Sequence, residues 1–155
     1  MERREVQRPE IPVAPDHFEV TVEDAILATE LRSAVAVCVY DAAEEAGALL
    51  HLRCIVKASK PADTTDTTLA TELLLLDRCL EALREAAPAA RHLQARIVAH
   101  LAESAQARPV LETVVTLVRH YLADAGVEIL PDDVAAGPAR MLRFRPGMGW
   151  VHTRA

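Results

Sequence analysis

Cysteine and histidine are the side chains of this sequence best suited to nucleophilic chemistry. The chain contains Cys38, Cys54 and Cys79, and His51 lies in an apolar segment close to one of them. A cysteine thiolate attacks an amide carbonyl when a histidine accepts and returns the proton, so a Cys/His pair would indicate amide hydrolysis. Cys54 is three residues from His51, however, an odd step that places the two side chains on opposite faces of a regular strand. Spacing alone therefore predicts no pair between them.

The other histidines do not have the spacing of metal ligands. His92, His100, His120 and His152 show no pairing at four-residue steps and no Cys/His cluster, so we expect no metal site and no cofactor. An odd number of cysteines without CxxC spacing fits reduced thiols better than a disulfide framework. We therefore interpret the cysteines as buried or inert.

Length and composition restrict the class of protein. With 155 residues, 51% of them hydrophobic but only 3% aromatic, the chain predicts one domain whose core is built from Ala, Val and Leu. The net charge is −6 without a dense Lys/Arg block, which argues against nucleic acid and anionic membranes as partners. The first residues lack the apolar segment of a signal peptide, and no apolar run reaches the roughly 20 residues of a membrane span. We expect a cytoplasmic protein.

Strand patterns dominate the first third of the chain. Residues 1–16 contain Pro9, Pro12 and Pro15 and predict an extended N-terminal arm, followed by a single domain over 17–155. Apolar residues alternate over 18–22, and a second apolar run covers 25–31.

A strand pair is predicted next. Residues 33–40 are β-branched without polar alternation, as in a central strand covered on both faces. After a turn at 41–47, residues 48–56 return antiparallel to it.

Two long helices follow. Asp66 or Thr67 is positioned to cap a helix that ends near Ala87 and whose leucines recur at three- and four-residue steps. A strand over 92–100 precedes a second helix, from Pro109 to Gly126. Short strands are expected at 127–130, 141–144 and around Trp150 and Val151. This order predicts an α/β fold, an α/β sandwich with a mixed β-sheet covered by two main helices.

Several short motifs of this chain correspond to those of one known protein family. Residues 31–41, LRSAVAVCVYD, resemble the strand entry L-G-S-C-V-A-V-C-x-x-D, and 47–51, GALLH, match G-x-x-x-H at the same spacing. Residues 93–97, LQARI, resemble L-x-A-K-I, and Asp66 fits an aspartate before the first long helix. Gly126-Val127, then 132–136 and Arg140, resemble G-I…E-D-x-G-G…R. These motifs resemble those of the CheD family of bacterial chemotaxis proteins, and the similarity extends from about Phe18 to Val151.

The resemblance implies a CheD-like fold, deamidation of chemoreceptor glutamines as the family activity, and partnership with a CheC-type phosphatase in some members. The nucleophilic cysteine of the family corresponds to Ala34 here, which has no reactive atom. The threonine that orients the histidine in the family corresponds to Ala28, and period-2 alternation predicts that Thr29 faces away. His51 would then remain as a vestigial base.

No other cysteine replaces the missing one by simple geometry. Cys38 is four residues beyond Ala34, or roughly 13 Å along a strand. Glycines of the family motifs are also changed, to Arg32, Ala99-His100 and Ala135-Ala136, which suggests that a close substrate groove is not maintained.

The sequence therefore predicts a pseudoenzyme, a catalytically inactive CheD-like module that binds chemoreceptors or another chemotaxis protein. The alternative is an active deamidase, a hydrolase that uses an unforeseen nucleophile such as Cys54 or Ser33. A third possibility is a regulator that shares only the fold. Arg140, Arg143 and Arg145 form either one basic stripe along a strand or a solvated strand face.

Overall fold

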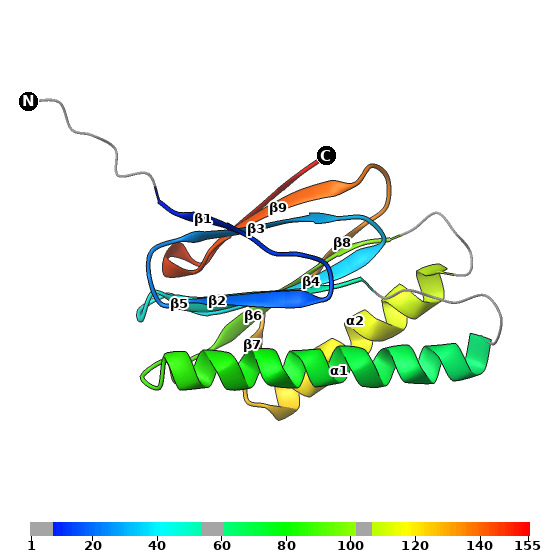
Figure 1. Cartoon of the computed structure of the whole chain (residues 1–155), viewed down its shortest axis with the longest axis horizontal. Coiled ribbons are helices and arrows are strands. Elements are labelled where there is room, and N and C mark those ends of the chain that lie inside the picture. The colour runs from blue at the N-terminus through cyan, green and yellow to red at the C-terminus, as the bar shows by residue number, and fades with distance from the viewer. Residues whose placement is uncertain (1–7, 54–60, 102–106) are drawn as a thin grey trace, which may run out of the picture.

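A computed structural model describes residues 8–53, 61–101 and 107–155, with the backbone alone over 61–69. It consists of three layers, in which a smaller sheet, a larger sheet and a pair of helices are stacked in that order (Figure 1). The predicted α/β sandwich is confirmed. A second sheet, which the sequence pattern did not predict, covers the face of the larger sheet opposite the helices.

Each sheet combines strands from distant parts of the chain. The smaller sheet has the order β1 (Glu10–Pro12), β3 (Ile26–Leu31), β9 (Arg140–Arg145), β10 (Trp150–Arg154). The larger sheet has the order β2 (His17–Thr21), β5 (Ala46–Leu52), β4 (Ala34–Asp41), β6 (Gln94–His100), β7 (Glu128–Ile129), and β8 (Asp133–Ala135) also pairs with β6. Consecutive strands β2 to β5 therefore alternate between the sheets, apart from the β4–β5 hairpin.

Strand β4 is the centre of the molecule, and all eight of its residues are buried. Val35, Val37 and Val39 belong to the core between the larger sheet and the helices. Ala34, Ala36, Cys38 and Tyr40 belong to the core between the two sheets. The prediction of a central strand covered on both faces is confirmed, and β5 pairs antiparallel with it as expected.

The helices pack on the outer face of the larger sheet (Figure 1). Helix α1 spans Pro61–Ala86, so the predicted start at Asp66 or Thr67 is wrong. Pro61 is compatible with the first turn of α1, because backbone N–H groups at the start of a helix have no helical acceptor and proline lacks this N–H. Helix α2 spans Ala107–Asp124, and Gly126 after it adopts the left-handed conformation that is common after a helix end, with φ of 81°. Neither helix in the described part of the chain combines the length and apolarity that crossing a bilayer requires.

The N-terminal arm takes part in the fold. Within it, β1 pairs in parallel with β3, with Glu10 opposite Ile26, and Val13 after it is buried between the sheets. At the other end of the chain, the 3-10 turn Pro146–Met148 connects β9 to β10. The arm therefore completes one edge of the smaller sheet and helps to enclose the core between the sheets.

Candidate functional site

His51 lies in the interior, between the two sheets. On β5, Leu50 and Leu52 face the helices and Leu49 faces the smaller sheet, so alternation directs His51 toward the smaller sheet as well. Its neighbour in register on β4 is Ala36. Only 2% of the residue is exposed, so the imidazole is enclosed by protein.

Thr29 is the partner of this histidine. The Thr29 hydroxyl lies 2.7 Å from His51 Nδ1, across the space between the sheets. The same hydroxyl donates a 2.8 Å hydrogen bond to the carbonyl of Val13. A single hydroxyl hydrogen cannot serve both contacts, so Thr29 accepts from Nδ1–H. The ring is therefore held with its proton on Nδ1 and its lone pair on Nε2.

The prediction that Thr29 faces away from His51 is wrong. Leu27, Thr29 and Leu31 are the buried residues of β3, whereas Ala28 lies on the other face, opposite Arg143. The alternation of side chains does not extend from Ala34 back to Thr29, because β3 and β4 belong to different sheets. Ser33, between the two strands, has a left-handed backbone conformation with φ of 49°. A turn of this kind resets the alternation of side chains.

The electrostatic surroundings keep His51 neutral. Burial lowers the pKa of the imidazole, and the nearby Arg53 guanidinium acts in the same direction, while the Asp16 carboxylate opposes them. Asp16 and Arg53 are themselves joined, at 3.0 Å between Arg53 Nη2 and Asp16 Oδ2. A neutral imidazole with a defined tautomer has the properties of a general base.

The position beside this base carries no nucleophile. Ala34 and Cys38 each lie two residues from Ala36, so both are diagonal neighbours of His51, with side chains about 7 to 8 Å away. Ala34 and Ala36 offer only methyl groups. Burial raises the pKa of the fully enclosed Cys38 thiol, so it stays protonated and unreactive.

Cys79 does not complete the site either. Cys79 lies in the core beneath the helices, on the far side of the larger sheet from His51, and burial raises its pKa to about 12. Cys54 lies outside the described residues.

His100 adds a contact that its sequence position did not indicate. It pairs with Ala34 across β6 and β4, and its Nδ1 accepts a 2.8 Å hydrogen bond from the backbone N–H of Ser33. Its Nε2 lies 2.6 Å from the carbonyl of Gly137 and donates to it. A backbone N–H beside a nucleophile position is the kind of donor that stabilises an oxyanion. Here the Ser33 N–H already donates to the His100 imidazole, so it is not free to stabilise an oxyanion.

The arginines of β9 do not form one basic stripe. Arg143 and Arg145 lie on the outer face of the smaller sheet, where they pair with Glu10 and Asp24. Arg140 points the other way and bonds to Asp133 and Thr153, each at 2.7 Å. The stripe interpretation is therefore wrong, because each guanidinium is paired with a carboxylate. Within the described ranges, no group of three or more His, Cys, Asp or Glu side chains is arranged to hold a metal ion.

Glu72 is a buried carboxyl group that the sequence did not identify. It lies on α1, it is only 5% exposed, and no hydrogen-bond partner for its Oε2 is found in the described part of the chain. Burial raises the pKa of Glu72 to about 7, with Asp16 adding to the effect and Arg53 opposing it. The helical spacing of leucines around it predicts a buried face, but periodicity alone does not show that a glutamate shares that face.

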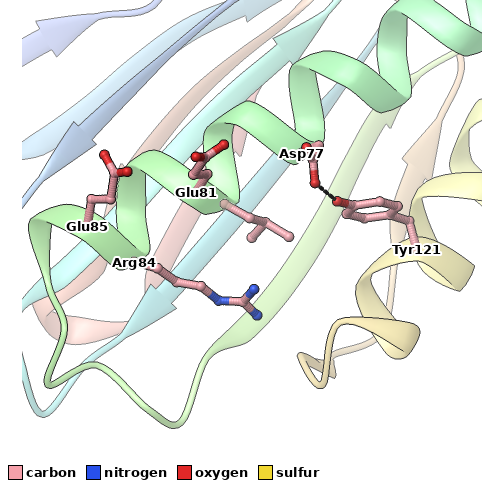
Figure 2. Close-up of a pocket in the computed structure, with 6 residues that line it drawn as sticks. Asp77, Glu81, Arg84, Glu85 and Tyr121 are labelled. Carbon is pink, nitrogen blue, oxygen red and sulfur yellow. Dashed lines mark hydrogen bonds between the residues drawn. The ribbon is translucent and has the colours of Figure 1, made fainter.

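A second polar site lies in the groove between the helices, on the other side of the larger sheet (Figure 2). The groove encloses about 370 Å³, and Asp77, Glu81, Arg84, Glu85 and Tyr121 contribute polar groups to it. The Tyr121 hydroxyl donates to Asp77, and burial together with this bond raises the pKa of Tyr121 to about 12. Arg84 donates to the carbonyl of Ala125 at 2.9 Å. These hydrogen bonds connect α1 to the C-terminal end of α2.

No protein-family model matches the chain, and no curated protein matches it either. The class of protein is therefore defined by its fold and by the residues around His51. The protein is a three-layer α/β sandwich with a buried, oriented His–Thr pair, beside which β4 carries Ala34, Ala36 and the buried, protonated thiol of Cys38.

Proposed function

We propose that this chain is a CheD-like chemotaxis protein that acts by binding, without deamidating its partner. The motifs of residues 31–41 and 47–51 support the assignment to that family, and the partners it implies are chemoreceptors or a CheC-like phosphatase. The observation that carries the proposal is the combination of a buried His51–Thr29 pair, at 2.7 Å, with Ala34 at the position of the family nucleophile.

Three features of the site argue against covalent catalysis. A thiol deamidase needs a sulfur atom beside the base, a donor for the oxyanion and an entrance for the glutamine side chain. Here Ala34 has no sulfur, the Ser33 N–H is bound to His100, and His51 is almost fully enclosed. Binding through the surface is the role that remains for a CheD-like fold with this interior.

One observation favours the alternative of an active deamidase. His51 is neutral and its lone pair is on Nε2, the state that a general base requires. Ser33 or Cys54 would then supply the nucleophile. The same experiment distinguishes the two functions.

The test uses the purified chain with purified cytoplasmic fragments of chemoreceptors that carry glutamine, and with a CheC-type phosphatase. Isothermal titration calorimetry measures binding, and intact-mass spectrometry detects conversion of an amide to an acid. We expect a complex with one of these partners and no change in the mass of the receptor fragment.

Two results would contradict the proposal. A mass increase that disappears in the His51→Gln variant would establish the deamidase, and Ser33→Ala and Cys54→Ser would then identify its nucleophile. Absence of binding to both partners would remove the chemotaxis role and favour a regulator that shares only the fold.

A further inference from the structure

Strand β10 presents an open edge of the smaller sheet. Residues Trp150–Arg154 pair with β9 on one side, and no other strand of the described chain pairs with them on the opposite side. The strand contains no proline and keeps a regular register with β9 over its five residues. An edge of this kind offers unpaired backbone N–H and C=O groups to another strand.

The two faces of β10 have different characters. Val151 and Thr153 pair in register with Phe144 and Leu142, which are buried, and so turn toward the interior. Trp150, His152 and Arg154 turn outward. The rings of Trp150 and His152 are stacked, with centroids 5.5 Å apart and planes inclined by 3°. Trp150 is 40% exposed.

This sequence is complementary to itself when two copies run antiparallel. A two-fold axis at His152 places Trp150 of one copy opposite Arg154 of the other, and the reverse, on the outer face. A guanidinium over an indole is a favourable cation–π contact, and the symmetry supplies it twice. On the inner face, Val151 meets Thr153 of the second copy, a pair of β-branched side chains suited to adjacent strands.

The other edges lack this complementarity. Strand β1 has three residues and includes Pro12, and β7 has two residues. Strand β2 has five residues, but a two-fold axis at its centre would bring Glu19 opposite Glu19 of the second copy. Like charges directly opposite each other destabilise a strand pair. Among the described edges, β10 alone is both long enough and self-complementary.

We infer that β10 is a homodimerisation strand, which pairs antiparallel with β10 of a second copy about a two-fold axis at His152. The two four-stranded sheets become one continuous eight-stranded sheet. Five residues on each side bury less surface than the roughly 1,200 Å² of a small stable interface. The dimer is therefore weak and forms with increasing concentration.

Disulfide trapping tests the register directly. In a Cys54→Ser background, His152→Cys brings the two thiols face to face, so we expect a crosslinked dimer after mild oxidation. Trp150→Cys alone leaves its thiols four residues apart along the pair, about 13 Å, and should not crosslink. Trp150→Cys combined with Arg154→Cys restores the match and should crosslink. Glu19→Cys on β2 is the control for another exposed edge.

Sedimentation equilibrium provides the second measurement. The average mass of the natural chain should rise with concentration from 16.9 kDa toward twice that value. Arg154→Glu should weaken the dimer about tenfold, as expected for two lost cation–π contacts. Arg91→Glu, an equal charge change at an exposed site outside the smaller sheet, should leave it unchanged. A monomer at all concentrations, or crosslinking of Trp150→Cys or Glu19→Cys as readily as His152→Cys, would overturn the inference.

Discussion

The Thr29 hydroxyl oxygen accepts a hydrogen bond from His51 Nδ1–H across the boundary between the two sheets, with 2.7 Å between the oxygen and the nitrogen. The contact joins β3 of one sheet to β5 of the other, and a second hydrogen bond, from Thr29 to Val13, continues it to the segment after β1. A polar chain inside an apolar core is stable only when each member has a partner. These hydrogen bonds therefore fix the orientation of the imidazole and the relative positions of β5, β3 and the segment after β1.

Replacing Thr29 by valine tests that relationship. Thr29→Val preserves shape but leaves the His51 N–H and the Val13 carbonyl without their partner, which should lower the free energy of unfolding by about 1–3 kcal/mol. Urea denaturation measures the loss, and nitrogen NMR of the His51 ring should show a change in tautomer population. Thr113→Val, at an exposed hydroxyl on α2, should change stability by less than about 0.5 kcal/mol. Equal stability of the two variants would show that the buried contact contributes nothing.

Glu72 predicts an unusual dependence of stability on pH. Its pKa rises from 4.5 to about 7 on folding, chiefly through burial, so the folded state binds the proton more tightly than the unfolded chain does. The protonated Glu72 carboxyl therefore contributes its full stabilisation below about pH 4.5, and this contribution is lost as the pH rises through about 7. Glu72→Gln should remove this loss. Between pH 5 and pH 8 the free energy of unfolding of the natural chain should therefore fall by about 2 kcal/mol more than that of the variant.

The matched control for this variant is Glu85→Gln, an exposed glutamate on the same helix. Urea denaturation at the two pH values should give it the same pH dependence as the natural chain. If Glu72→Gln also left the pH dependence unchanged, Glu72 would not be a protonated, buried carboxyl.

Thiol reactivity tests whether the site is closed. In a Cys54→Ser background, Cys38 and Cys79 should resist an aromatic disulfide reagent in the native state, because both are buried and burial raises their pKa values. Both should react in denaturant. Ala34→Cys in the same background should be equally protected, since Ala34 is fully buried.

Val134→Cys, at an exposed position on β8, is the control that should react at once. Rapid labelling of Ala34→Cys in the native protein would reveal an entrance to the His51 site and would weaken the argument for a closed, non-catalytic interior.

The elements that bury apolar residues were predictable from the sequence. Residues 33–40 lack polar alternation because both faces of β4 are covered, and the leucine spacing before Ala87 reflects one buried helical face. Periodicity reports how many faces of an element are buried, so it located the central strand, the hairpin after it and both helices. The absence of a cysteine at position 34 was likewise visible without a structure.

Tertiary structure alone decided which residues meet His51. Thr29 faces His51, contrary to the prediction from alternation, because a left-handed turn at Ser33 carries the chain from one sheet to the other. The same limitation concealed the second sheet, the pairing of β1 with β3, and the contact of His100 with the Ser33 N–H. Local pattern records the burial of each strand but not the strand packed against it, because partners far apart in sequence meet only through the topology of the chain.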